Sequence, residues 1–313
     1  MPYNKQISIG LDIGGSHVTS AAFDLNEKEI IASSVATKQV DGHDTSDAII
    51  QNWADVIAES KEKAGDSELA GIGFAMPGPF DYENGIGRFE LVDKFENLNG
   101  VDVFHELKNK LGLSDKLPIR FINDATAFAL GEALIGKGKR YRNVMVITLG
   151  TGFGSAFIKA GVPVVNGSDV PKQGCLWHVN YKESIADDYF STRWFLNEYK
   201  KLTHNSATGV KQIAEEAKVN FTIACLFEYF GHNLAEFLSP HIQTFETQAI
   251  ILGGNISKAY PLFKESFENK LQNKQKNIDI HVSVLKEDAA IYGASLLTDN
   301  ELYERIKPTL KFM

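Results

Sequence analysis

Cysteine is scarce in this sequence. The chain of 313 residues has only two cysteines, Cys175 and Cys225. Two cysteines cannot supply the several disulfide bridges that hold small secreted domains together, and there is no Cys-x-x-Cys pair of the kind that binds zinc. We therefore expect neither a disulfide framework nor a zinc site.

Long apolar runs and targeting signals are missing as well. No apolar run is long enough to cross a bilayer, so we expect no membrane partner. The N-terminal stretch MPYNKQISIG lacks the basic segment and the apolar stretch of a secretory signal peptide. These absences predict a cytoplasmic protein.

Positive charge is also in short supply. The chain has 32 Lys and Arg residues against 40 Asp and Glu residues, which gives a formal net charge of −8. This balance argues against nucleic acid as a partner, because nucleic-acid binding depends on neutralising many phosphates. A phosphorylated small molecule is not excluded, because backbone amides can bind a phosphate locally.

What the sequence does contain is an alternation of short apolar runs and helical patterns. Strands are predicted at residues 7–13, 18–25, 69–75, 118–122, 144–149, 155–158, 249–252 and 278–285, and helices at 45–63, 124–135, 221–238 and 287–297. The third helix is expected to stop near Pro240, since proline is disfavoured inside helices. This order of elements predicts an α/β fold.

Two stretches of the chain share one pattern. Residues 7–25 and 144–158 both contain a strand, a turn of glycine and hydroxyl residues, and a second strand. This likeness, together with the chain length, predicts two related domains that face each other across a cleft. We place an N-terminal domain at 1–117 and a larger C-terminal domain at 118–297, and a C-terminal helix at 298–313 is available to complete the first domain.

The first turn follows an unusual carboxylate. In LDIGGSH, Asp12 interrupts an apolar strand that ends on Gly14, Gly15 and Ser16. Burying an unpaired carboxylate is costly. A phosphate with its Mg²⁺ would explain all four residues, since glycines let a phosphate approach the backbone, and Asp12 could hold the metal directly or through water.

The second turn offers similar chemistry. In LGTGFGSA, Thr151 and Gly152 stand between two strands, so the turn is neither a P-loop nor a dinucleotide fingerprint. Either turn alone could be a plain tight hairpin. A third glycine pair, Gly253 and Gly254, follows a strand and could lie against a nucleoside, or could be a simple strand-to-helix turn.

A candidate general base stands at the start of a predicted helix. In IRFINDATAFALG, a strand delivers Asn123 and Asp124 to the helix start. Asp124 could be a helix N-cap, or a base that accepts a hydroxyl proton during phosphoryl transfer. Asn123 offers both a donor and an acceptor, which suits a sugar hydroxyl.

These motifs together resemble the ROK family of sugar kinases and repressors, part of the hexokinase/actin/Hsp70-like superfamily. The stretches that carry the resemblance, in order along the chain, are LDIGGS, MPGPFD at 76–81, ENLNG at 96–100, INDATAFALGE at 122–132, VITLGTGFGSAF at 146–157, ILGGN at 251–255 and AAIYGASLL at 289–297. The resemblance implies two ribonuclease-H-like (actin-like ATPase) domains. It also implies ATP-dependent phosphorylation of a hexose or aminohexose hydroxyl with Mg²⁺, and assembly as a dimer or tetramer.

The resemblance also implies roles for individual residues. Asp124 would be the general base. The sugar would contact Gly78, Asn97, Asn123, Asp124, Cys175, His178 and Asp187, and the nucleotide with its metal would contact Asp12, Gly14, Gly15, Ser16, Thr151, Gly152, Gly253 and Gly254.

This chain departs from the family pattern in three places. The usual Gly-Glu-x-Gly-His stretch is GCLWH here, so Cys175 replaces a carboxylate that binds sugar hydroxyls and Trp177 replaces a glycine. The cysteine-rich zinc segment of the family is replaced by residues 179–191. The closing Glu of that segment aligns best with Asp187, with Asp188 one position away. His17 stands where a Lys usually follows the hydroxyl residue of the first turn.

Other functional classes stay open beside the sugar kinase. A repressor of this family carries an additional helix-turn-helix domain, for which the residues before the first strand leave no room. A sugar-binding protein without turnover is the main alternative, because the Glu at position 175 is lost. Retention of Asp12 and Asp124 argues against it, since binding alone does not need a base. A chaperone or filament ATPase would have no use for the Asn123–Asp124 pair.

Overall fold

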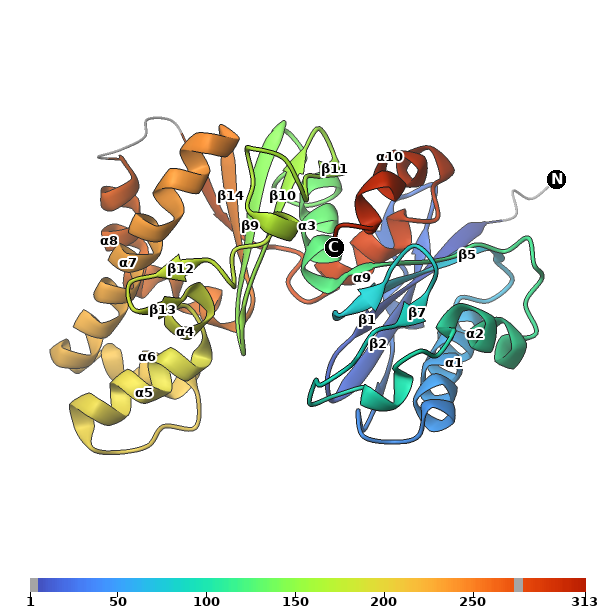
Figure 1. Cartoon of the computed structure of the whole chain (residues 1–313), viewed down its shortest axis with the longest axis horizontal. Helices are drawn as coiled ribbons and strands as arrows, with labels where there is room; N and C mark the ends of the chain where they lie inside the picture. The colour runs from blue at the N-terminus through green and yellow to red at the C-terminus, as the bar shows by residue number, and fades with distance from the viewer. Residues whose placement is uncertain (1–4, 273–277) are drawn as a thin grey trace. The chain divides into compact units, whose positions relative to one another are not determined.

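The computed structural model describes residues 5–272 and 278–313, and these fall into two compact units (Figure 1). Unit 1 comprises Met1–Ile135 and Glu287–Met313, and unit 2 comprises Gly136–Lys286. Unit 2 is continuous in sequence, whereas unit 1 is assembled from the two ends of the chain.

The sheet of unit 1 has the strand order β3-β2-β1-β5-β8, with β4 paired to β2. Its strands are β1 (Gln6–Ile13), β2 (His17–Asp24), β3 (Glu29–Ile30), β4 (Ala36–Gln39), β5 (Glu68–Met76) and β8 (Ile119–Asn123). Strand β2 is antiparallel to β1, whereas β5 is parallel to both β1 and β8. The carboxyl ends of β1, β5 and β8 therefore meet at one edge of the sheet.

Five helices accompany this sheet among the described residues: α1 (Ser46–Lys63), α2 (Val103–Leu111), α3 (Asp124–Leu134), α9 (Asp288–Leu296) and α10 (Asn300–Leu310). Helix α1 forms because Ile49, Trp53 and Ile57 recur at helical spacing and are buried, and Thr45 caps its first turn. Helices α3 and α9 pack against each other, and α9 also packs on β1 and β5 (Figure 1). The short hairpin β6 (Phe80–Asp81) and β7 (Ile86–Gly87) completes the unit.

The sheet of unit 2 has the strand order β11-β10-β9-β14-β15. Its strands are β9 (Asn143–Leu149), β10 (Phe153–Lys159), β11 (Val162–Pro163), β14 (Ala249–Gly253) and β15 (Asp279–Val282). Strands β9, β10 and β11 are antiparallel, and β14 is parallel to both β9 and β15. Strand order and direction thus repeat those of unit 1, which confirms the internal likeness expected from the two glycine–hydroxyl turns.

The helices of unit 2 are α4 (Ala186–Tyr189), α5 (Thr192–Thr203), α6 (Val210–Ala217), α7 (Phe221–Phe245) and α8 (Tyr260–Gln272), and a hairpin of β12 (Asn180–Tyr181) and β13 (Ser184–Ile185) precedes α4. Helix α7 does not stop before Pro240 as predicted but continues to Phe245. It continues because Ile242 and Phe245 extend its buried face into the core, and that burial outweighs the lost backbone hydrogen bond.

The division between the units differs from the predicted boundary at residue 118. Strand β8 pairs with β5, and α3 packs on α9, so the chain stays in unit 1 as far as Ile135. Residues 287–297 likewise belong to unit 1, together with the C-terminal helix α10. Among the described residues, no helix combines the length and the apolar character needed to cross a membrane.

Candidate functional site

Unit 1 gathers its predicted site residues at one edge of its sheet. Asp12 of β1 stands opposite Ala75 of β5, and Met76 at the end of β5 stands opposite Asn123 at the end of β8. Asp12, the loop after β5 and the Asn123–Asp124 pair are therefore neighbours at the carboxyl ends of three parallel strands. This is the edge where open α/β sheets commonly bind ligands.

The helix that begins at Asp124 is capped by its neighbour. Asn123 Oδ1 accepts a hydrogen bond from Thr126 N at 3.2 Å, so Asn123 and not Asp124 is the N-cap of α3. The Oδ1 atom of Asp124 accepts hydrogen bonds from Ala125 N at 2.8 Å and from Asn123 Nδ2 at 3.0 Å. Its Oδ2 atom has no hydrogen-bond partner among the described residues, so this oxygen is available to a substrate proton.

Burial makes Asp124 a stronger base than an exposed carboxylate. Desolvation raises the pKa of Asp124, and the hydrogen bonds from Ala125 and Asn123 oppose this rise only in part. The side chain is partly exposed at the strand edge. An incoming hydroxyl can therefore meet a carboxylate with a raised proton affinity, as general-base chemistry near neutral pH requires.

Asp12 is a carboxylate without a partner. No hydrogen bond or ion pair engages it within the described residues. Burial, followed by the negative charges of Asp124 and Glu287, raises the pKa of Asp12 to about 7. A divalent cation would relieve this repulsion and supply the missing partner, so the residues present fit an Mg²⁺ held by one carboxylate and phosphate oxygens.

The turn after Asp12 leaves two backbone amides unpaired. Gly14 N donates to His17 O at 2.9 Å, and the Ser16 hydroxyl lies 3.2 Å from His17 Nδ1. The amides of Gly15 and Ser16 have no partner in the described parts of the chain. Adjacent free amides beside glycine form a suitable cradle for a phosphate oxygen.

Lys94 is a residue that the sequence reasoning missed. A Cβ atom placed on Gly15 would lie 2.7 Å from Lys94 Nζ, so the ammonium group stands directly over the turn. Lys94 is exposed, and no acidic partner binds it in the portion of the chain that the structure describes. Its neighbour Phe95 is buried and donates its amide to Gly42 O at 2.8 Å, which anchors the segment. No local motif marks Lys94, because its contact is with a turn far away in the sequence.

The predicted sugar residues of unit 1 are placed differently from one another. Gly78 lies in the loop after β5, where a Cβ would stand 3.2 Å from the Tyr82 hydroxyl. That hydroxyl donates to Met76 O at 3.1 Å, and Asn123 Nδ2 lies 3.4 Å from it, so Gly78 and Asn123 share one neighbour. Asn97 Nδ2 instead donates to the carbonyl groups of residues 43 and 44. Its amide nitrogen thus braces a loop.

Unit 2 brings its two glycine motifs together at the equivalent edge of its own sheet. Gly253 ends β14 opposite Thr148 of β9, and the turn that begins with Gly150 follows β9 directly. A Cβ on Gly254 would lie 2.4 Å from Leu149 O, and its φ is +78°, so only glycine fits there. Thr151 and Gly152 are exposed residues, and their amides have no partner among the described residues.

Cys175 and His178 contact each other in unit 2. Cys175 Sγ lies 3.6 Å from His178 Nδ1 and 3.7 Å from Lys172 O. Burial raises the pKa of Cys175 to about 11, and burial together with nearby Lys172 lowers the pKa of His178. Both side chains are therefore neutral near pH 7, and a hydroxyl would meet a thiol and an imidazole instead of a carboxylate.

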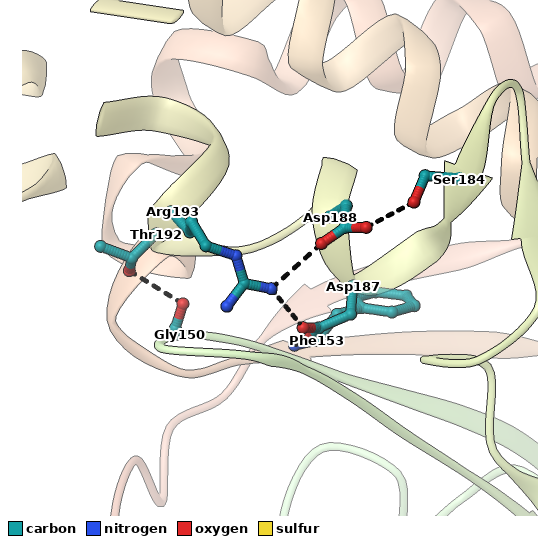
Figure 2. A network of polar contacts seen from close by, with 7 residues as sticks. All are labelled: Gly150, Phe153, Ser184, Asp187, Asp188, Thr192 and Arg193. Carbon is teal, nitrogen blue, oxygen red and sulfur yellow. Dashed lines mark hydrogen bonds and ion pairs between the residues drawn. The ribbon is translucent and has the colours of Figure 1, made fainter. Parts of the chain in front are cut away.

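Asp187 is already occupied by protein groups. Its Oδ1 accepts a hydrogen bond from Phe153 N at 2.7 Å, and its Oδ2 pairs with Arg193 at 2.7 Å (Figure 2). Asp188, one position further, pairs with the same Arg193 at 3.2 Å and accepts from Ser184. The carboxylate that the resemblance assigns to a sugar hydroxyl thus holds the end of the Thr151–Gly152 turn.

The described residues contain no group of three or more His, Cys, Asp or Glu side chains that could hold a metal ion. Asp12, together with the oxygens of a phosphate, is a candidate cation site in the described part of the chain.

These features define an α/β protein of two units that repeat one strand order, each with a glycine–hydroxyl turn after its first strand. The chain belongs to the ROK family, whose profile matches residues 8–301. The predicted resemblance is thereby confirmed.

Two named relatives align with most of the chain. A glucokinase of Thermotoga maritima is 27% identical, with 92% of this chain and 95% of the relative aligned. An N-acetyl-D-glucosamine kinase of Haemophilus influenzae is 26% identical, with 79% of this chain and 84% of the relative aligned.

A solved structure agrees with the fold. The ROK family glucokinase of Streptomyces griseus, in complex with glucose and AMPPNP, superimposes with a TM-score of 0.69 at 21% identity, and the alignment covers 93% of this chain and 98% of that one. The predicted fold class, an α/β chain of two actin-like ATPase domains, is confirmed.

Proposed function

We propose that this protein is an ATP-dependent sugar kinase that phosphorylates a hydroxyl group of a hexose or aminohexose. The observation that carries the proposal is the pair of carboxylates at the strand edge of unit 1. Among the described residues, Asp124 offers an unpaired oxygen with raised proton affinity, and Asp12 has no hydrogen-bond or ion-pair partner. The names of the glucokinase and N-acetylglucosamine kinase relatives support the substrate class.

Asp124 accepts the proton of the attacking hydroxyl in this proposal. Its Oδ2 receives the proton, while Ala125 N and Asn123 Nδ2 fix Oδ1 and so orient the carboxylate. Phosphoryl transfer requires mainly positioning and charge stabilisation, so one oriented base is sufficient. Asn123 and Gly78 are the sugar contacts that we propose in unit 1.

Each unit has a turn that suits phosphate oxygens. In unit 1, the amides of Gly15 and Ser16, which have no partner among the described residues, and the Lys94 ammonium offer donors and positive charge. In unit 2, the Thr151–Gly152 turn offers backbone donors of the same kind. Mg²⁺, held by Asp12, would neutralise the charge that develops on the transferred group. Gly254 has no side chain, and its backbone packs closely against Leu149. We assign the flat backbone at Gly254 to the nucleoside.

A coupled assay with MgATP and a panel of sugars tests the proposal. The panel comprises glucose, mannose, fructose, allose, N-acetylglucosamine and N-acetylmannosamine, and we expect turnover with at least one of them. In Asp124→Asn, kcat should fall by roughly 10²–10⁴-fold, because the general base is lost. The dissociation constant for that sugar should stay close to the wild-type value.

Two results would contradict the proposal. Absence of turnover across the panel, with sugar binding retained, would identify a sugar-binding protein without catalysis. Near-normal turnover of Asp124→Asn would remove Asp124 from the mechanism.

A further inference from the structure

An arginine and two acidic side chains flank the turn at residues 150–153 in unit 2 (Figure 2). We infer that Asp187 and Arg193 are positioning residues that keep this turn in its phosphate-binding shape, and that Asp187 does not bind the sugar. The inference rests on the proposed function, because the phosphates concerned are those of the nucleotide.

The turn is fixed on both of its flanks. At its start, Gly150 O accepts hydrogen bonds from Thr192 N and from Thr192 Oγ1, each at 2.8 Å. At its end, Phe153 N donates to Asp187 Oδ1 at 2.7 Å. A hydrogen bond from Gly150 N to Gly152 O at 3.1 Å closes the turn itself. With both flanks held, the two central residues, Thr151 and Gly152, are kept in one conformation.

Asp187 can hold the turn because it is itself fixed. Its backbone amide donates to Trp177 O at 3.1 Å, and its Oδ2 pairs with Arg193 at 2.7 Å. Arg193 stands in the first turn of α5 next to Thr192, so neighbouring residues of one helix brace the two flanks of the turn (Figure 2). A sugar hydroxyl would have to share a carboxylate whose two oxygens already accept charged or backbone donors.

Arg193 also offsets the negative charge beside the turn. A Cβ on Gly152 would lie 3.1 Å from Asp187 Oδ1, so a negative charge stands immediately beside the proposed phosphate site. Asp188 adds a second negative charge, and Arg193 pairs with both carboxylates. Without the guanidinium, these carboxylates would repel an incoming phosphate. Arg193 therefore both holds Asp187 and offsets its charge.

The expected effect is on nucleotide affinity. Asp187→Ala and Arg193→Ala should each raise the dissociation constant for AMPPNP on the order of 10-fold. This is the lower end of the range expected when a charge-assisted hydrogen bond is lost, because the site is half exposed. The dissociation constants for glucose and N-acetylglucosamine should change by no more than about twofold. Arg193→Lys, which keeps the charge, should recover part of the affinity.

A double-variant cycle separates this inference from general loss of structure. Asp187→Ala with Arg193→Ala should lose less affinity than the sum of the single changes, because both act through one contact and the double variant leaves no unpaired charge at position 187. The matched control is Lys201→Ala on the same helix, whose ammonium pairs with Glu198 at 2.6 Å. It should bind AMPPNP like the wild type. Lys201→Ala and Arg193→Ala should melt near the wild-type temperature, because exposed ion pairs contribute little stability. Asp187→Ala should melt somewhat lower, because it also leaves Phe153 N without its acceptor.

The outcomes distinguish two kinds of failure. If Asp187→Ala weakens binding of glucose or N-acetylglucosamine and leaves AMPPNP binding unchanged, Asp187 is a sugar ligand and this inference is wrong. If Asp187→Ala and Arg193→Ala behave like Lys201→Ala, or lower both affinities equally, the inference is also wrong while the kinase proposal stands. A wild-type protein that binds no AMPPNP and phosphorylates no sugar overturns both.

Discussion

Asp12 is a residue whose charge state changes near neutral pH. Its ordinary pKa is 3.8, and burial and nearby carboxylates raise it to about 7 in the folded chain. Between these two values the folded state holds a proton that the unfolded state has released, so the contribution of Asp12 to stability falls as pH rises through this window. Mg²⁺ competes with that proton, so cation binding should strengthen over the same range.

Melting temperatures with and without Mg²⁺ at several pH values test this expectation. Stabilisation by Mg²⁺ should increase between about pH 5 and pH 8 in the wild type, as Asp12 ionises. In Asp12→Asn, Mg²⁺ should raise the melting temperature only slightly at every pH. If the rise in melting temperature caused by Mg²⁺ does not depend on pH in the wild type, or persists in Asp12→Asn, another group binds the cation.

A second prediction for a single residue concerns the role of Lys94 in ATP binding. Lys94→Ala should raise KM for ATP by roughly 10-fold, since it removes a cation that stands over Gly15. KM for the sugar should change little, and Lys94→Arg should retain most of the affinity. Lys116→Ala is the control, because Lys116 is another exposed lysine of unit 1. Equal ATP affinities in Lys94→Ala and Lys116→Ala would exclude Lys94 from phosphate binding.

At the scale of elements, α9 is docked through glycines. A Cβ on Gly73 of β5 would lie 1.8 Å from Ala294 O, and a Cβ on Gly293 of α9 would lie 1.8 Å from Ala127 O of α3. The backbones are therefore in contact, with no room for a methyl group. Because α3 begins at Asp124, the docking of α9 also determines where the candidate base stands.

Gly73→Ala should therefore destabilise the protein by about 1–3 kcal/mol or more, as overpacking against backbone does. Differential scanning calorimetry would record a lower melting temperature. Gly209→Ala provides the control, since nothing lies within 4 Å of a Cβ at that position. An unchanged melting temperature in Gly73→Ala would mean that α9 can move away from the sheet at little cost.

Elements with a local signal were predictable from the sequence, and contacts between distant segments were not. The hairpins around Gly14 and Gly150 follow from apolar strands that meet at glycine, which is a local pattern. The end of α7 was predicted wrongly, because the packing of Phe245 outweighs the effect of Pro240. The contacts of Asp187 with Phe153, and of Lys94 with Gly15, join segments whose approach depends on the whole fold.

At the scale of the whole molecule, unit 2 is an uninterrupted insertion between the two segments of unit 1. It has its own five-stranded sheet and its own buried cluster, which includes Met145, Leu234 and Ile250. The predicted boundary at residue 118 fell inside unit 1 because a proline that opens a strand does not reveal which sheet that strand joins. Strand pairing between β8 and β5 decides this, and it involves residues far apart in the sequence.

A fragment of residues 136–286 should therefore fold on its own and unfold in one cooperative thermal transition, because its core is complete within that range. Circular dichroism would follow the transition. A matched fragment of residues 118–286 begins at the boundary that the sequence predicted and adds β8 and α3. Its melting temperature should be no higher than that of the fragment 136–286. A fragment 136–286 that shows no cooperative transition would mean that its stability depends on unit 1.

The repeated strand order has a consequence for how this protein can change over evolutionary time. Asp12 and Thr148 each occupy the penultimate position of the first strand of their sheet, so one half has an ionisable group where the other has a hydroxyl. The two halves of such a repeated scaffold can take different roles. In the proposed mechanism the general base belongs to one copy, so the other copy can change without altering that group.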